Sequence, residues 1–315
     1  MASARDPRHL EAIAERFEGE LNVESFLLEL EHGFTSLKYA YVGPAAHTHD
    51  ELAKRDGYKA NVDATTIEAP LVERHGASDQ VEIGPGNGQH ALQLLHELSN
   101  RAHPERILLL DFSRTLLDLC CARMIGTRAL VIDRAHWDFE AGPTYEIDRW
   151  RRRPQEPLLA TIIGHTLGNP RDLSGVLVNI ANSLQAADRL LISVALRQDT
   201  DPLAGYETPE FRTAATEPFR MLGLAVEPGR LLLSVDSVAS VVASVALTER
   251  ERNHLSDQFG VQAPSIISCF QSRRFLPEDV PEHAQLSGLL REIDRSVATD
   301  GSHAAFVFEC LERRP

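Results

Sequence analysis

One stretch of the chain, VEIGPGNGQH at residues 81–90, decides the fold. It begins with a short apolar run, continues with three alternating glycines, and leads into an amphipathic segment, ALQLLHEL at residues 91–98. This order predicts a strand, a tight turn and a helix. Glycine suits a turn whose backbone has a positive φ or lies directly against a ligand. Because open α/β sheets bind ligands at the carboxyl ends of their strands, we expect a binding loop here.

The glycine spacing separates several kinds of loop. A phosphate loop would end in Gly-Lys followed by Ser or Thr, and residues 84–90 contain no such ending. A dinucleotide-binding loop has the spacing G-x-G-x-x-G, whereas Gly84, Gly86 and Gly88 follow G-x-G-x-G, with Glu82 two positions before the first glycine. An ordinary tight turn between a strand and a helix also stays open as an alternative.

The full pattern, E-x-G-x-G-x-G, resembles the first motif of class I S-adenosylmethionine-dependent methyltransferases. The resemblance implies S-adenosylmethionine as the cofactor, with Glu82, Gly84, Gly86 and Gly88 at its site. It also implies an enzyme. Further cofactor-binding residues are expected after the strands that follow.

The composition limits the choice of partners. The chain has 315 residues, of which 25% are charged and 43% hydrophobic, as in ordinary globular proteins. Its net charge of −14 and a single basic run, residues 149–153, argue against nucleic acid, because phosphate neutralisation needs a basic stripe. No signal peptide or membrane segment is expected, since the longest near-apolar stretch, 231–247, contains Asp236. Four cysteines without C-x-x-C spacing predict a reducing, cytoplasmic setting without a thiolate metal site.

From about residue 79, apolar runs alternate with segments of helical periodicity. Runs this apolar, each separated by a helix, predict a parallel sheet buried on both faces. Right-handed crossovers then give an α/β fold with a Rossmann-like, doubly wound sheet. The expected strands span residues 80–83, 106–111, 129–133, 158–164 and 189–195.

The alternation is absent on either side of this region. Helical spacing predicts helices within 8–32 and 209–222, and the capping box that starts at Thr248 predicts another. We expect strands within 231–247 and at 265–270, a helix over 278–297 and a terminal strand over 303–311, the last segments completing the sheet. The stretch 38–58 reads as irregular. The chain is thus expected to form a second, smaller lobe from the N-terminal helices and an insertion after the fifth strand.

Within that irregular stretch, His47, His49 and Asp50 raise the question of a metal site. A zinc site needs further ligands at suitable spacing, and the neighbouring sequence supplies none. We expect these residues to cap loops and to start a helix, and we expect no metal.

Two acids follow the second and third strands. Asp111 ends the second strand, where a carboxylate can accept hydrogen bonds from ribose hydroxyls, or else cap a helix together with Ser113. After the third strand, Asp138 and Phe139 offer a carboxylate for an adenine amine and an aromatic face for its ring. A polar turn beside a buried tryptophan is the alternative there.

The turn after the fourth strand, GHTLGNP at residues 164–170, combines small residues with an asparagine that can both donate and accept. Gly164 allows close approach of the cofactor. His165 is a candidate base, or a structural residue.

This turn resembles the glycine-bounded motif of the histidine-specific Nα-methyltransferases of ergothioneine biosynthesis. Three further short motifs match that family in the same order, and the resemblance spans roughly residues 37–199. They are KYAY at 38–41 followed by Glu51 and Leu52, DGY at 56–58 followed by Ala64 and Thr65, and DFE at 138–140.

The resemblance implies a lobe that closes over an amino-acid substrate. It assigns the substrate's head group to Gly168 and Asn169, and other substrate contacts to Tyr41, Tyr58 and Tyr206. A base is needed only if the nucleophile arrives protonated, and Tyr58 and His165 are the candidates. The implied domains are a helical part of the substrate lobe (1–62), the cofactor-binding core (63–199), an inserted part of the substrate lobe (200–262) and the completion of the core (263–315).

One departure from the family bears on the substrate. Where the family reads imidazole with a Glu-x-Ser pair, this chain has Phe270 and Ser272. We therefore expect N-methylation of an amino acid or amino-acid-like molecule other than histidine. A guanidinium side chain, stacked on Phe270 by cation–π attraction and paired with an acid, is favoured over other choices. The candidate acids are Asp50, Glu51, Asp199, Asp201, Glu207 and Glu210.

Three alternatives stay open at this point. The first is histidine Nα-methylation itself. The second is a nucleotide-binding oxidoreductase, against which the glycine spacing argues. The third is a non-catalytic nucleotide-binding or regulatory module on the same fold.

Overall fold

The computed structural model describes residues 7–55, 63–127, 130–203 and 205–312. The chain divides into two compact units, which we name by their sheets. The large-sheet unit comprises the described parts of 59–112, 116–199 and 274–315, and the small-sheet unit those of 1–58, 113–115 and 200–273.

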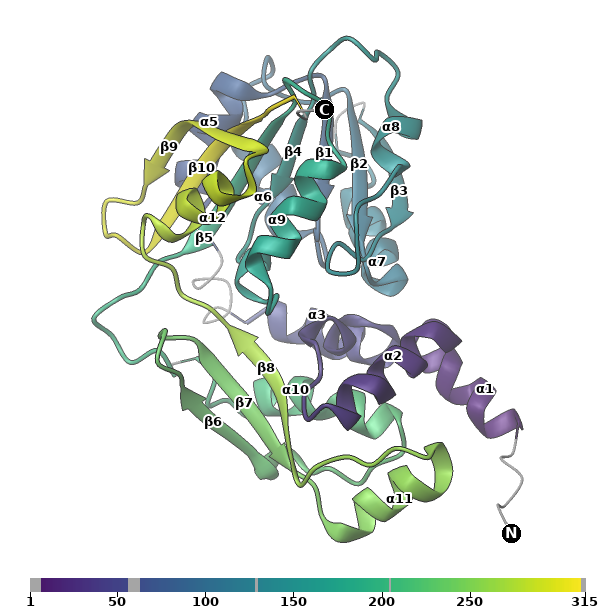
Figure 1. The fold of residues 1–315 in the computed structure, drawn as a ribbon. Helices are drawn as coiled ribbons and strands as arrows, with labels where there is room; N and C mark the ends of the chain where they lie inside the picture. Colours follow the sequence, from purple (N-terminus) through teal and green to yellow (C-terminus); the bar gives the residue numbers. More distant parts are fainter. Residues whose placement is uncertain (1–6, 56–62, 128–129, 204, 313–315) are drawn as a thin grey trace. The chain divides into compact units, whose positions relative to one another are not determined.

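The large-sheet unit contains a seven-stranded sheet with the strand order β3-β2-β1-β4-β5-β10-β9 (Figure 1). Strands β1 to β5 pair in parallel, and β10 runs antiparallel to both β5 and β9. The strand order reverses between β1 and β4, so the loops after these two strands face each other across the switch point. The strands are β1 (Asp79–Ile83), β2 (Arg106–Asp111), β3 (Val131–His136), β4 (Leu159–Ile162), β5 (Arg189–Ala195), β9 (Leu290–Val297) and β10 (His303–Cys310).

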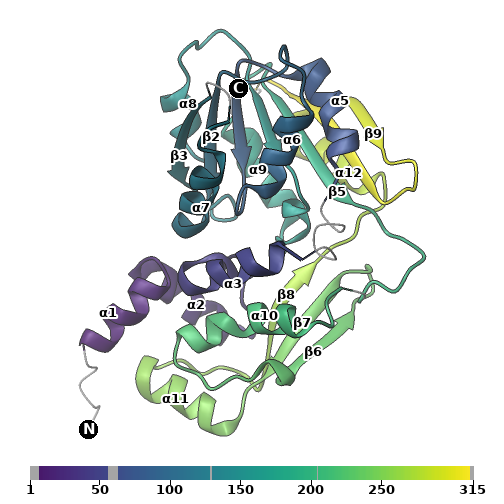
Figure 2. The same cartoon turned by 180° about the vertical axis from the view of Figure 1, so that it is seen from behind.

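Both faces of this sheet are covered, as the apolar runs predict. Alternate residues of β2 belong to different cores: Leu108 and Leu110 pack on one face, Ile107 and Leu109 on the other. Figure 1 shows α9 (Leu173–Asn182) and α12 (Asp279–Ser287) over the first face. Figure 2 shows α5 (Thr65–His75) and α6 (Gln89–Glu97) over the second, where α7 (Arg114–Met124) also packs. A short helix, α8 (Glu146–Trp150), precedes β4. This arrangement confirms the predicted Rossmann-like α/β fold.

The small-sheet unit has a three-stranded antiparallel sheet, β6-β7-β8, and helices from both ends of its sequence. Its core is aromatic: the Phe26 ring lies 5.0 Å from the rings of Phe17 and Tyr39 and 6.1 Å from that of Phe219, centroid to centroid. These contacts join the N-terminal helices to the segment after β5. Its elements are α1 (Pro7–Arg16), α2 (Glu20–Glu31), η1 (Leu37–Tyr41), α3 (Gly43–Ala53), α10 (Pro209–Met221), η3 (Pro228–Arg230), β6 (Leu231–Val235), β7 (Val241–Ala246), α11 (Glu249–Phe259) and β8 (Ile266–Ser272).

Three local predictions are wrong. The strand at 265–270 does not help to complete the large sheet, because β8 pairs with β7, with Phe270 opposite Ala243. The helix over 278–297 ends at Ser287, where Gly288 takes a left-handed φ of 67°, and β9 follows. The described part of the stretch 38–58, residues 38–55, contains η1 and α3 rather than only irregular structure.

In α3 the polar sequence hides a buried side. Ala45, Ala46 and Leu52 are buried, and Pro44 stands in the first turn, where proline is tolerated. At α11, by contrast, the capping box is confirmed. Thr248 accepts the N–H of Glu251, and the Glu251 carboxylate accepts the N–H of Thr248. None of the described helices is both long and apolar enough to cross a bilayer.

Candidate cofactor and substrate sites

The glycine-rich loop between β1 and α6 has a left-handed backbone at each glycine. The φ angles of Gly84, Gly86 and Gly88 are 66°, 56° and 77°. A Cβ on Gly84 would lie 2.6 Å from Thr166 Cγ2, and one on Gly88 would lie 2.5 Å from Cys120 Sγ, so packing excludes side chains there. A Cβ on Gly86 would meet no atom within 4 Å. The loop is therefore open at Gly86, where a ligand has room.

Asp111, at the end of β2, supports this loop. It is buried, and its Oδ2 accepts a hydrogen bond from the Gly86 N–H at 3.2 Å. The carboxylate thus lies beside the open part of the loop. This agrees with its prediction from the sequence as a ribose-binding acid.

The segment after β3 reaches the same loop. Phe139 Cε1 lies 3.7 Å from the position of a Cβ on Gly84, and the Phe139 ring packs edge-on against Trp137, centroids 6.1 Å apart. Asp138 Oδ1 accepts the N–H of Glu140 at 3.1 Å, which shapes the turn. An aromatic ring and a carboxylate therefore accompany the glycines.

The turn after β4 lies on the other side of the switch point. Gly164 and His165 have positive φ angles of 66° and 71°, and a 3-10 turn, η2 (Thr166–Gly168), follows. Thr166 Oγ1 lies 3.2 Å from the Gly84 carbonyl and 2.9 Å from that of Ile163, both acceptors for its hydroxyl. Asn169 ends the turn, half-buried. The Thr166 hydroxyl therefore links the turn directly to the glycine-rich loop.

His165 itself is buried within the large-sheet unit. Burial lowers the pKa of its imidazole well below the usual value, and the positive charge of Arg274 and the neighbouring His303 lower it further. Its Nε2 lies 3.5 Å from Arg274 Nη1. The ring is therefore neutral and a poor proton acceptor at neutral pH, which favours the structural role over the catalytic one.

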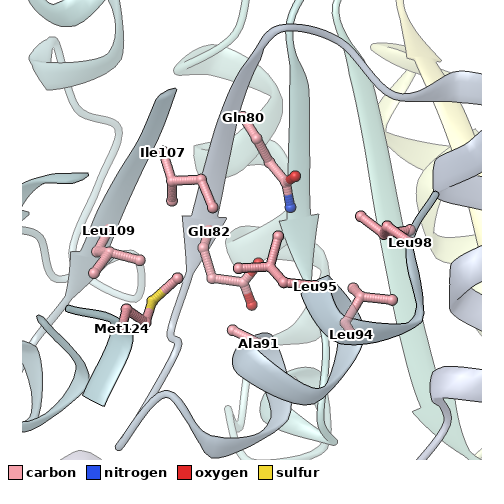
Figure 3. Close-up of a pocket in the computed structure, with 9 residues that line it drawn as sticks. All are labelled: Gln80, Glu82, Ala91, Leu94, Leu95, Leu98, Ile107, Leu109 and Met124. Atoms are coloured by element: carbon pink, nitrogen blue, oxygen red, sulfur yellow. The ribbon is translucent and has the colours of Figure 1, made fainter. Parts of the chain in front are cut away.

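Glu82 lies beneath the loop. It is only 2% exposed, and it accepts a hydrogen bond from the Thr161 hydroxyl on β4. Burial, only partly offset by that bond, raises its pKa to about 8. Figure 3 shows Glu82 and Gln80 beside a small cavity, about 10 Å³ of space for the centre of a water molecule, with apolar side chains of α6 around it. Its carboxyl is thus surrounded by the fold.

Glu68 and His90 also lie in this region, although the sequence did not predict a role for them. His90 Nε2 lies 2.7 Å from Glu68 Oε2, and the other Glu68 oxygen accepts the Ser193 hydroxyl. The ring atom Cγ of His90 lies 3.6 Å from the position of a Cβ on Gly164. The sequence signal for a buried role of Glu68 is its place in the otherwise apolar run IEAPLV, residues 67–72.

The small-sheet unit groups three of the predicted substrate residues. The Tyr206 hydroxyl and Ser272 Oγ share a hydrogen bond of 2.8 Å. Phe270 is 6% exposed, with its ring 5.5 Å from that of Tyr206 and 4.7 Å from that of Phe211, centroid to centroid. Phe211, which the sequence did not single out, completes this aromatic cluster (Tyr206, Phe211, Phe270).

Of the other two predicted tyrosines, Tyr41 lies among the described residues. Tyr41 packs edge-on against His49, with ring centroids 4.5 Å apart. Burial lowers the pKa of His49 to about 4, against the opposing charge of Asp50. Tyr58 lies outside the described residues. Among the described residues, no group of His, Cys, Asp and Glu side chains has the arrangement of a metal site.

The large-sheet residues fit S-adenosylmethionine. The open Gly86, the acid at the end of β2, the aromatic ring after β3 and the small turn at Gly164 surround the carboxyl ends of adjacent strands, where such ligands bind. The cofactor supplies an activated methyl group, and the protein supplies binding and orientation.

Several solved methyltransferases resemble the chain at low identity. The S-adenosylmethionine-dependent methyltransferase from Clostridium acetobutylicum ATCC 824 is 13% identical, over 85% of this chain and 98% of that one, with a TM-score of 0.42. The N-methyltransferase NodS from Bradyrhizobium japonicum WM9, in complex with S-adenosyl-L-homocysteine, is 14% identical, over 84% and 97%, with a TM-score of 0.43. Such identities carry no information about the substrate. No curated protein matches the sequence.

A family model gives the decisive match. It covers residues 64–225, just over half of the chain, and therefore includes the glycine-rich loop and the turn after β4. Its description is "Histidine-specific methyltransferase, SAM-dependent". The chain belongs to this family and is an S-adenosylmethionine-dependent methyltransferase.

Proposed function

We propose that the protein methylates the amine nitrogen of a free amino acid whose side chain is uncharged and apolar or aromatic. The observation that carries this proposal is the aromatic cluster of Tyr206, Phe211 and Phe270, with Ser272 hydrogen-bonded to Tyr206. Apolar rings of this kind favour an apolar or aromatic partner through burial and edge-to-face contacts. We assign substrate side-chain recognition to the small-sheet unit and cofactor binding to the large-sheet unit, with the boundary after β8.

Three of the six acids on which an arginine-like substrate would depend support the same choice. Asp50 Oδ2 lies 2.9 Å from Lys54 Nζ, and Glu210 Oε1 lies 3.4 Å from Arg55 Nη2. Asp201 Oδ1 accepts the Leu203 N–H. A buried guanidinium needs a carboxylate partner, and these carboxylates already serve the protein's own donors. The uncharged side chain is therefore preferred to the guanidinium.

For the head group we assign Gly168 and Asn169. The asparagine amide can donate to a carboxylate and accept from an amine at the same time, which suits an amino acid. Bound S-adenosylmethionine would supply the methyl group for the new N–C bond and leave as S-adenosylhomocysteine, and the amine would lose its proton to solvent. The contribution of the chain is to hold the nitrogen in line and to exclude water.

The test is a competition assay with S-adenosylmethionine and an equimolar mixture of phenylalanine, tyrosine, tryptophan, leucine, arginine and histidine. Products are separated and identified by mass spectrometry. We expect methylated aromatic or apolar amino acids to dominate. Predominant methylation of arginine would contradict the proposed side-chain class.

The family description favours histidine as a second candidate, and Ser272 and Tyr206 suit it. The variant Phe270→Glu separates the two candidates. It restores the carboxylate that the family resemblance implies at this position, so histidine turnover should rise while turnover of aromatic substrates falls. Phe259→Glu, at a buried ring of α11, is the matched control for a carboxylate placed elsewhere in the same unit. If unmodified protein already prefers histidine, the second candidate is correct.

A further inference from the structure

A buried ionic group lies between α5 and α6, beside the loops assigned to the cofactor. Glu68, in the first turn of α5, is 0% exposed. One of its oxygens is 2.7 Å from His90 Nε2, and the other accepts the hydroxyl of Ser193 on β5. Both oxygens are therefore occupied by donors. A buried carboxylate held in this way fixes the orientation and the tautomer of the imidazole that it contacts.

The second nitrogen of His90 has no partner among the described residues, and it is not among their buried atoms that lack one. The side chain is 13% exposed, so Nδ1 retains contact with solvent. The ring packs against Gly164, at the switch point between β1 and β4. In the Glu68–His90 pair, the accessible polar atom is thus His90 Nδ1, and it lies where the loops after β1 and β4 meet.

We propose that Glu68, supported by Ser193, is a positioning residue that holds His90 as an imidazolium against Gly164, so that its Nδ1–H is presented to the carboxylate of a bound ligand. The ligand is either the cofactor, through the carboxylate of its methionine part, or the amino acid, in which case the inference rests on the proposed function. In either case the charge-assisted hydrogen bond forms only with protonated His90.

The charges around His90 support this state. Burial is the largest single effect and lowers the pKa of His90, but the charge and the hydrogen bond of Glu68, together with weaker contributions from neighbouring acids, raise the pKa overall. Asp63 ahead of α5 acts in the same direction, and Glu82 on β1 does so only once it loses its proton, at about pH 8. Because the pKa is raised, the charged form persists to higher pH than in a free imidazole. Ligand affinity should therefore be complete at low pH and fall as pH rises through the raised pKa.

The test is calorimetric binding of S-adenosylhomocysteine to the full chain from about pH 6 to about pH 9, the range in which a histidine near neutrality titrates. Loss of one charge-assisted hydrogen bond corresponds to roughly tenfold or more in affinity. We expect such a fall in the unmodified protein, a fall at lower pH in Glu68→Gln, and a flat profile in His90→Lys. In Asp294→Asn, which removes the charge that Asp294 on β9 places 2.8 Å from His75 at the end of α5, the profile should not change.

Two further arms identify the source of the carboxylate. 5′-Methylthioadenosine lacks the carboxylate, so a pH dependence seen only with S-adenosylhomocysteine points to the cofactor. A dependence seen only on adding tyrosine, and not tyramine, points to the amino acid. The first arm contains no amino acid, so a wrong substrate assignment leaves it intact.

The proposal is overturned if Glu68→Gln and the unmodified protein share one pH profile with every ligand, or if His90→Asn binds as well as the unmodified protein at low pH. Should Glu68→Gln fail to fold, the comparison of His90→Lys with His90→Asn decides. A structural role alone would make these two variants equally weak.

Discussion

At the scale of single residues, the three glycines of the loop have different reasons for being glycine. A Cβ on Gly84 would clash with Thr166, and a Cβ on Gly88 would clash with Cys120. A Cβ on Gly86 would enter open space. All three also need a backbone that L-residues rarely adopt. A side chain at Gly86 would thus extend into the volume that we assign to the ligand.

This difference predicts the behaviour of Gly86→Val. The variant should fold with a moderate loss of stability and lose S-adenosylhomocysteine binding, measured by calorimetry. Gly288→Val is its control, because Gly288 also has a positive φ (67°) and open space around it, but it follows α12 rather than a strand of the parallel sheet. If both variants bind the ligand equally well, Gly86 is not at the cofactor site.

At the scale of elements, local signals succeed where a helix begins and fail where long-range pairing decides. The capping box at α11 satisfies two backbone donors through Thr248 and Glu251, and Glu251 is held as well by Arg230, at 2.7 Å. Arg230 and Thr248 hydrogen bonds together keep the pKa of Glu251 low despite burial. The start of α11 is thus stabilised by contacts that its own sequence and one tertiary partner supply.

We predict that Thr248→Ala destabilises the protein by about 1 kcal/mol, the usual effect of losing an N-cap. Thr208→Ala, at the start of α10, removes a cap with one hydrogen bond and no reciprocal partner, so it should cost less. Thermal unfolding measured by circular dichroism checks the order. A larger loss for Thr208→Ala would contradict the role of the reciprocal pair.

At the scale of the whole molecule, stability depends on pH through Glu82. Burial raises its pKa from 4.5 to about 8, so the folded state keeps a proton that the unfolded state releases. The free energy of unfolding should therefore fall as pH rises between about 4.5 and about 8. Each pKa unit corresponds to about 1.4 kcal/mol, so the total effect is a few kcal/mol.

Glu82→Gln should remove this dependence, because the amide oxygen can still accept the Thr161 hydroxyl while no proton titrates. Urea unfolding at several pH values provides the measurement. Glu97→Gln, at the exposed end of α6, should leave the dependence as it is. A Glu82→Gln profile that still falls between these pH values would show that another group is responsible.

The sequence by itself determined the parallel strands β1 to β5 of the large sheet, the glycine-rich loop and the residues that follow β2, β3 and β4. Apolar runs, glycine spacing and capping residues are local signals, and the parallel sheet places the ends of its strands at one edge. Only the tertiary structure decided which sheet β8 joins, that Glu82 turns beneath the loop, and that Glu68 reaches His90. Strand pairing and buried polar contacts join residues far apart in the chain, so no short segment of sequence carries the information that fixes them.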